Sequence, residues 1–230
     1  MTAAFPSASV VIPTFNRLTD LQRVVRAIRE QFVPEGSGLE VVVVDDGSTD
    51  GTAAWLGGQI SSGDLTVITQ DNAGPAAARN RGARAASGEV LLFLGDDTEP
   101  ASGWLHAHLE EHRLDGDRKG TLGVVGYTGF PPSEDSPFLR FINEMGAQFG
   151  YELIEDPQAV PFNFFYTSNV SLPRGFFLDI GGFREDFSAA AWEDIEFAHR
   201  ACAGGLRIHY RPIARTTHHH RVRPGTFCSR

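Results

Sequence analysis

The sequence predicts an α/β fold: a single domain with a mostly parallel central sheet flanked by helices. Four short apolar runs are rich in Val, Ile or Leu, as expected for parallel strands covered on both faces. They are Ser9–Ile12, Leu39–Val44, Leu65–Thr69 and Glu89–Leu94. Segments of helical character separate the runs, which gives the alternation of βαβ units. A chain of 230 residues is long enough to form one substantial core.

The segments between these runs carry helix signals. Apolar side chains of the first segment recur at spacings of three and four, which predicts an amphipathic helix. They are Leu18, Leu21, Val24, Val25 and Ile28. Asp50 or Ser48 is a candidate cap for a second helix. Pro75–Ala86 is rich in alanine and predicts a third helix, with Pro75 suited to the first turn.

The second half of the sequence is less regular. Tyr127–Phe165 is rich in Pro, Gly and Phe with weak periodicity, which predicts an insertion or a substrate-facing loop region. We expect a strand near Tyr166–Leu172, a helix at about Trp192–Ala203 and a strand at Leu206–Tyr210. No linker marks a second domain, so residues 1–230 are expected to form one. The abrupt ending FCSR leads us to expect a longer natural chain.

The composition of the chain indicates which kinds of partner the protein binds and in which compartment it is expected. The formal net charge of −9 argues against non-specific binding to nucleic acid. Cys202 and Cys228 are too few for a disulfide framework or a cysteine-based zinc site, which favours a reducing compartment. The N-terminus has no basic leader region, and no apolar run reaches the roughly 18 residues of a membrane span. We therefore expect a cytoplasmic protein, and peripheral contact with the inner face of the membrane stays open.

Two pairs of acids follow two of the predicted strands. In open α/β sheets, ligands bind beyond the carboxyl ends of the strands, where Asp45–Asp46 and Asp96–Asp97 fall. Acids in such a place also cap helices, and for Asp45–Asp46 alone both interpretations are equally good. Asp96 and Asp97 leave an apolar strand directly, so their charges repel unless a positive group neutralises them. A Mg²⁺ or Mn²⁺ ion shared with substrate phosphates suits these oxygen ligands.

Six motifs, in this order, resemble those of family 2 glycosyltransferases with the GT-A fold, over about residues 8 to 220. They are VVIPTFNR at Val10–Arg17, VVDDGSTD at Val43–Asp50, NAGPAAARNRGARAASGE at Asn72–Glu89, LGDDTEP at Leu94–Pro100, GGFRED at Gly181–Asp186 and WEDIEFAHR at Trp192–Arg200. The resemblance implies an inverting transfer of a sugar from a nucleotide diphosphate donor to a hydroxyl acceptor, with Mn²⁺ or Mg²⁺ as cofactor. A UDP-sugar is the favoured donor, and GDP- or TDP-sugars are alternatives.

The resemblance makes about residues 8–100 the nucleotide-sugar-binding half. Pro13 and Phe15 would contact the base, and Asp46 would accept a hydrogen bond from a base N–H. Arg79 would approach the nucleotide, although an exposed helix face explains it equally well.

The implied metal ligands lie in two motifs. Asp97 would bind the metal directly, and Asp96 would lie nearer the ribose or a metal-bound water. Gly95 is a departure, because the family often has a third acid there. One histidine of THHHR would complete the metal shell; strand alternation points His218 and His220 to one face and His219 to the other. We prefer His218, and a solvated polar end to the domain is the alternative.

About residues 101–220 would bind the acceptor and carry the catalytic base. Asp194 matches the family's catalytic aspartate, and Glu193 would orient the acceptor or hold the local structure. Asn169, Gly182 and Phe183 are candidates for contacts with the acceptor or the sugar.

Two other functions are compatible with paired acids on an α/β sheet. A nucleotidyltransferase would have a Gly-rich phosphate-binding loop near its N-terminus, and SVVIPTFNR lacks that run of glycines. A catalytically silent nucleotide-binding protein is supported by Gly95, where an acid is missing.

Overall fold

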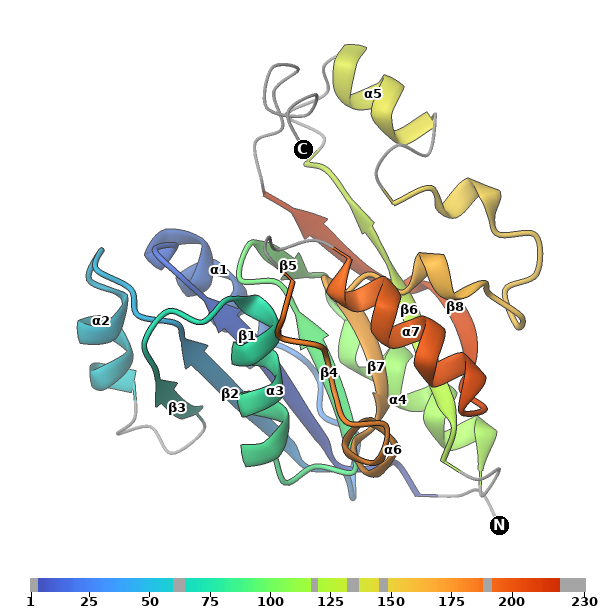
Figure 1. Ribbon diagram of the computed structural model, residues 1–230, viewed down its shortest axis with the longest axis horizontal. Helices are drawn as coiled ribbons and strands as arrows, with labels where there is room; N and C mark the ends of the chain where they lie inside the picture. Colours follow the sequence, from blue (N-terminus) through green and yellow to red (C-terminus); the bar gives the residue numbers. More distant parts are fainter. Residues whose placement is uncertain are drawn as a thin grey trace.

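The computed structural model describes residues 4–59, 65–116, 120–131, 137–144, 149–187 and 192–219. Its centre is an eight-stranded sheet of order β3-β2-β1-β4-β7-β6-β8-β5 (Figure 1). The strands are β1 Ala8–Thr14, β2 Leu39–Asp45, β3 Leu65–Thr69, β4 Val90–Leu94, β5 Thr98–Pro100, β6 Leu122–Gly129, β7 Asn169–Pro173 and β8 Arg207–His218.

The direction of the strands divides the sheet into two parts. β3, β2, β1 and β4 are parallel neighbours, which confirms the predicted βαβ units. β7 is antiparallel to both β4 and β6, while β6 and β8 run parallel to each other and the short β5 is antiparallel to β8. The carboxyl ends of β1, β2 and β4 therefore meet at one edge of the sheet.

Helices cover both faces of the sheet. The α-helices of the described residues are α1 Leu18–Arg29, α2 Thr52–Gln59, α3 Pro75–Ala85, α4 Trp104–Asp115, α5 Pro137–Glu144, α6 Arg174–Asp179 and α7 Glu193–Ala203, of which α5 lies away from the sheet (Figure 1). Side chains alternate along β1, so that Val10 and Ile12 pack with α1 and α4 while Val11 packs with α3. In Figure 1, α3 and α7 lie in front of the sheet and α4 behind it. In the described part of the chain, no helix is both long and apolar enough to cross a bilayer.

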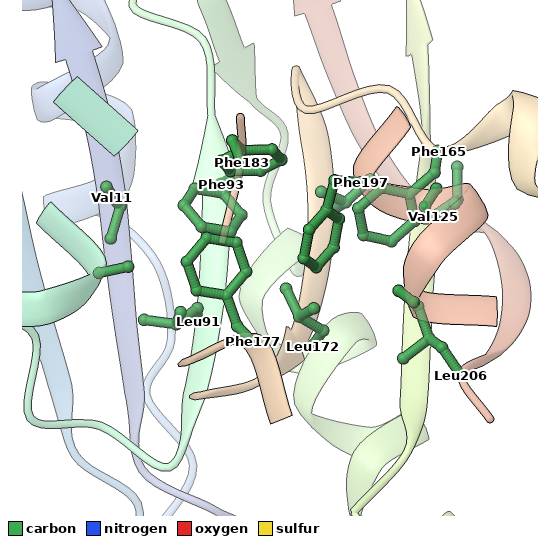
Figure 2. Close-up of a cluster of buried hydrophobic side chains, with 14 of the residues drawn as sticks. Val11, Leu91, Phe93, Val125, Phe165, Leu172, Phe177, Phe183, Phe197 and Leu206 are labelled. Atoms are coloured by element: carbon green, nitrogen blue, oxygen red, sulfur yellow. The ribbon is translucent and has the colours of Figure 1, made fainter. Parts of the chain in front are cut away.

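Four aromatic rings fill the core between β4, α6 and α7 (Figure 2). Phe183 lies 4.9 Å from Phe197 and 5.1 Å from Phe93 between ring centroids, and Phe177 lies 5.1 Å from both Phe93 and Phe197. Each such pair contributes about 0.5–1.5 kcal/mol beyond the burial of its surface. The cluster therefore fixes the start of α7 relative to the end of β4.

The second half is more regular than the sequence indicates. β6 is not among the predicted elements, because its glycines weaken the strand pattern; the strand ends inside the predicted loop region. Gly126 is required there, because a Cβ atom would lie 2.3 Å from the side-chain nitrogen of Asn169. β7 begins at Asn169 instead of near Tyr166, and β8 continues beyond Tyr210 to His218. α4 is not among the predicted elements, because its buried side includes polar His108.

Candidate active site

The acid pair Asp96–Asp97 lies where the carboxyl ends of β1 and β4 meet. Both residues are less than a tenth exposed, and the Thr14 hydroxyl donates to Asp96 Oδ2 at 2.9 Å. Burial and the neighbouring charge of Asp97 raise the pKa of Asp96 to about 7. The glycine at position 95 has a structural explanation, because a Cβ atom there would lie 2.7 Å from Thr98 Oγ1. This turn has no room for the third acid that the family often carries.

Arg17 is a site residue that the sequence analysis does not single out. Its Nη1 forms an ion pair with Asp97 Oδ2 and lies 3.9 Å from Asp96 Oδ1. Burial opposes the charge of Arg17, but Asp97 and Asp96 outweigh it and raise the pKa of the guanidinium. Its sequence signal is the last position of VVIPTFNR, directly before α1. The positive group that the acid pair requires is thus supplied in part by the chain itself.

His218 faces the same acid pair from β8. The pairing of β5 with β8 places His218 opposite Thr98, and His218 Nε2 lies 3.4 Å from Asp97 Oδ1. His219 points elsewhere and bonds Glu99 Oε2 at 2.7 Å, as strand alternation predicts. His220 lies outside the described residues. Of the two histidines of THHHR that the structure describes, His218 is the one that could bind the same metal ion as Asp97.

The donor types fit a hard divalent ion. Asp97 and Asp96 offer carboxylate oxygens and His218 an imidazole nitrogen, a set that suits Mn²⁺ and, through its oxygens, Mg²⁺. Within the ranges that the structure covers, no cluster of three or more His, Cys, Asp or Glu side chains stands ready as a metal site. A metal at Asp97 and His218 would therefore take further ligands from substrate phosphates or water.

The predicted base-contacting residues lie at the carboxyl ends of β1 and β2. Phe15 is 44% exposed and free to lie against a ring, whereas Pro13 is buried within β1. Asp46 is buried and accepts hydrogen bonds from Gln70 Nε2 at 2.7 Å and from the backbone N–H groups of Ala73 and Gly74 at 2.9 Å. Asp46 therefore holds the loop that leads into α3, and a bond to a base would use its remaining acceptor capacity.

Arg79 and Glu193 join α3 to α7. Arg79 Nη1 lies 2.9 Å from Glu193 Oε1 in an almost completely buried ion pair, and the guanidinium lies 5.9 Å from the centroid of the Phe183 ring. This arrangement supports the predicted structural role of Glu193. It also means that Arg79, predicted to approach the nucleotide, is engaged with a carboxylate of the catalytic motif.

Asp194 follows Glu193 in the first turn of α7. Its carboxylate accepts from the Thr167 N–H at 3.4 Å and from the Ile195 N–H at 2.8 Å. Burial raises the pKa of Asp194, Glu193 raises it further, and Arg79 counteracts the shift in part. A partly buried carboxylate with a raised pKa is a stronger proton acceptor than one in water, which suits a general base.

A row of aromatic rings connects Asp194 with His218, and we call Tyr166, Phe149 and His218 the aromatic row. Asp194 accepts from the backbone N–H of Thr167, the residue after Tyr166, at 3.4 Å. Burial raises the pKa of Tyr166, and the charge of Asp194 raises it further. The Phe149 ring lies 5.5 Å from both Tyr166 and His218. The predicted base and the predicted metal ligands thus border one continuous aromatic surface.

Asn169 has a different role from the predicted sugar contact. It is 1% exposed, and its side-chain nitrogen donates to the carbonyl oxygens of Tyr127 at 3.1 Å and Ala214 at 2.9 Å. Its side-chain oxygen accepts from Trp104 Nε1 at 2.7 Å. All these partners lie inside the protein, so Asn169 ties β7 to β6, β8 and α4.

Gly182 and Phe183 are also placed differently from the prediction. The Phe183 ring is buried in the aromatic core, so it is not available to a sugar. Asn80 accepts from the Phe183 N–H at 2.9 Å and donates to the Phe183 carbonyl at 2.8 Å. Gly182 has φ of +69°, and a Cβ atom would lie 2.5 Å from Asn80 Oδ1. Asn80 thus fixes the backbone at Phe183, whose ring packs against Phe197 of α7.

Two buried histidines of α4 complete the network around Asn169. His108 Nε2 lies 3.0 Å from Asn169 Oδ1, which can only accept, so His108 is protonated at Nε2. His108 Nδ1 then accepts from Ser171 Oγ at 2.9 Å, and Ser171 accepts from His112 Nε2 at 2.8 Å. Burial lowers the pKa of His108 to about 4 and that of His112 to about 3, so both rings are neutral.

This network predicts a loss of stability in mild acid. Because the pKa of His108 is about 4 in the folded chain and 6.5 in the unfolded chain, the unfolded chain binds more protons below pH 6.5. Stability should therefore fall as the pH is lowered from 6.5 towards 4, by about 2 kcal/mol between pH 7 and pH 5 for His108 alone. Urea unfolding of the wild type and of His108→Gln at both pH values measures the difference. His106→Gln is the control, because His106 lies on the same helix but packs against Phe5 and not in this network. Equal pH dependence of stability in His108→Gln and the wild type would contradict the assignment.

Comparison with known proteins places the chain in a family. Residues 9–168 match the model of Glycosyl transferase family 2. The chain is 33% identical over 231 residues to a validoxylamine A glucosyltransferase of Streptomyces hygroscopicus subsp. limoneus, with 89% of this chain and 50% of the relative covered. It is 29% identical to a pre-mycofactocin glycosyltransferase of Mycobacterium tuberculosis, covering 93% and 43% of the two chains. The chain spans about half the length of the curated relatives it matches.

Solved structures agree on the fold. A mannosyltransferase of Pyrobaculum calidifontis in complex with GDP-Man and Mn²⁺ has a TM-score of 0.70 at 24% identity, covering 96% of this chain and 59% of that one. TarS of S. aureus in complex with UDP-GlcNAc has a TM-score of 0.72 at 20% identity, covering 97% and 61%. The order of the sheet and the helices on both faces thus correspond to the GT-A fold. The chain belongs to glycosyl transferase family 2.

Proposed function

We propose that this chain is the catalytic part of an inverting glycosyltransferase that moves a sugar from a nucleotide diphosphate donor to a hydroxyl acceptor with a divalent metal. One observation carries the proposal. The aromatic row runs from the partly buried Asp194, which accepts from the N–H of Thr167 next to Tyr166, to His218, which lies 3.4 Å from Asp97, so the proposed base and the proposed diphosphate-binding edge border one surface. A nucleotidyltransferase has no need for a base in this position.

The donor is proposed from the chemistry of the strand ends and from the relatives. Phe15 offers an exposed ring to the base, and Asp46 retains acceptor capacity for a base N–H. The similar structures hold GDP-Man and UDP-GlcNAc. We place a UDP-sugar first, a GDP-sugar next and a TDP-sugar third, and the name of the most identical relative cited above favours glucose as the sugar.

Asp97 and His218 would hold a Mn²⁺ or Mg²⁺ ion, with Asp96 nearer the ribose or a metal-bound water. When bound, such an ion offsets the charge that develops on the departing diphosphate. Thr14 fixes the orientation of Asp96 through the hydrogen bond to Oδ2. Both carboxylates are buried, so their charge would act on a bound cation with less screening by water.

Asp194 would act as the base. Its carboxylate takes the proton of the acceptor hydroxyl as that oxygen attacks the anomeric carbon, while the bond from this carbon to the diphosphate oxygen breaks on the opposite side. The raised pKa of Asp194 brings its basicity closer to neutral pH. The Arg79–Glu193 pair and the Asn80–Phe183 hydrogen bonds hold the first turn of α7 in place for this step.

A thermal-shift panel tests the binding half of this proposal. We expect UDP, GDP or TDP to raise the melting temperature by several degrees with Mn²⁺ or Mg²⁺ and to lose the effect in EDTA, because a ligand that binds only the folded chain stabilises it. Release of the nucleoside diphosphate from the matching sugar conjugate then tests turnover. A metal-dependent shift without any turnover would favour a silent nucleotide-binding protein, and no shift with any nucleotide would contradict the donor assignment.

A further inference from the structure

The contact of Arg17 with the acid pair Asp96–Asp97 has no role in the reaction proposed above. Its guanidinium bridges both carboxylates of the acid pair, one as a close ion pair and the other at 3.9 Å. These are the side chains assigned to the metal and the ribose. A residue with this contact competes with a metal ion for the same oxygens, and it lies beside the proposed position of the donor diphosphate.

The charges in this part of the site change with each ligand. When both acids are ionised, the side chains of Asp96, Asp97 and Arg17 together carry a net negative charge. A divalent ion that binds alone makes the net charge of this group positive, beside the guanidinium. The diphosphate of a sugar nucleotide carries about two negative charges and offsets that excess. Arg17 therefore disfavours the metal alone and favours the metal together with the diphosphate.

The geometry allows the guanidinium to change partners while its backbone stays fixed. The next residue begins α1, and the N–H of Leu18 donates to Asp50 Oδ2 at 3.0 Å, which anchors this end of the helix. The side chain of Arg17 is 37% exposed, whereas its two partners are only 12% and 11% exposed. The acids are fixed and buried, and the long arginine side chain is the part that can move.

We propose that Arg17 couples metal binding to donor binding: it neutralises the acid pair when no metal is present and turns its guanidinium to the donor diphosphate when the metal binds. The planar fork of arginine suits two phosphate oxygens as well as it suits a carboxylate. Arg17 is thus a donor-positioning residue that makes metal and nucleotide affinity interdependent. The inference rests on the proposed metal and diphosphate site.

Titration with Mn²⁺, followed by the electron paramagnetic resonance signal of the free ion, tests the coupling. Wild type, Arg17→Met, Arg17→Lys and Arg26→Met are compared without nucleotide and with saturating UDP or GDP. We expect Arg17→Met to bind Mn²⁺ alone about tenfold more tightly than the wild type and to lose most of the gain that the nucleotide brings; coupling of this size is typical between linked sites. Arg17→Lys keeps the charge, so it should bind Mn²⁺ alone like the wild type and bind the nucleotide more weakly.

Arg26→Met is the matched control, because Arg26 is an exposed arginine of α1, the helix that follows Arg17, and its replacement removes the same charge. It should behave like the wild type in both titrations. Wild-type behaviour of Arg17→Met, or a loss of its Mn²⁺ binding, would overturn the coupling role while leaving the metal site intact in the wild type. Failure of the wild type itself to bind Mn²⁺ with either nucleotide would instead overturn the proposed metal site, and the inference with it.

Discussion

Asp194→Asn should lower the turnover number by about 10²–10⁴-fold while leaving the affinity for the donor nucleotide within about twofold. The amide has nearly the same shape as the carboxylate and still offers an oxygen to the Thr167 N–H, so the first turn of α7 stays in place. The amide loses the ability to take a proton, and of the two N–H groups that the carboxylate binds it gives up only that of Ile195. Nucleotide release with donor and acceptor present measures turnover, and calorimetry with UDP or GDP measures binding.

Glu196→Gln is the control for this change, because Glu196 lies in the same turn but pairs with Arg200. It should retain most of the activity. The wild-type pH profile gives an independent check: since the pKa of Asp194 is raised, activity should decline on the acid side at a higher pH than an ordinary aspartate would produce. Near-normal turnover in Asp194→Asn would show that the base is another group.

Asp97→Asn should weaken metal-dependent binding of the nucleotide by at least about 100-fold, because a neutral amide is a much poorer ligand for a hard cation than a carboxylate. The change also removes the charge that faces His218 and Arg17. Nucleotide affinity measured across a Mn²⁺ titration gives the result directly. In EDTA, the variant and the wild type should bind the nucleotide with similar weak affinity.

Glu99→Gln provides the comparison for Asp97→Asn. Glu99 is a carboxylate two residues further along, but it pairs with His219 on the other side of β5 and should leave the titration unchanged. If Asp97→Asn binds the nucleotide as well as Glu99→Gln at every Mn²⁺ concentration, Asp97 is not a metal ligand.

The first half of the fold could be predicted from the sequence because its strands are buried on both faces. Apolar runs such as Val41–Val44 are typical of strands buried on both faces. The acids at the ends of these runs fall where ligands bind in such sheets. β6 and α4 could not be predicted from the sequence, because some of their buried positions lack an apolar side chain. Gly126 and His108 occupy buried positions where the usual pattern has an apolar side chain.

The motifs predicted where the site lies more reliably than what each side chain does. Asp97 and His218 come together as expected, since strand alternation and the order of the sheet determine their direction. Asn169 and Phe183 are predicted from the same resemblance but face the interior, which only the packing of β7 and α7 decides. The role of Arg17 could not be predicted from the sequence, because its ion-pair partner Asp97 lies 80 residues away.

The pairing of β5 with β8 also bears on the order of folding. It joins Asp97 to His218, so the two proposed metal ligands meet only after the last described strand has docked on the sheet. During synthesis, the nucleotide end of the sheet can form long before this strand has left the ribosome. An unfinished chain would therefore carry the acids without the histidine, and tight capture of a metal ion would mark the molecules whose sheet is complete.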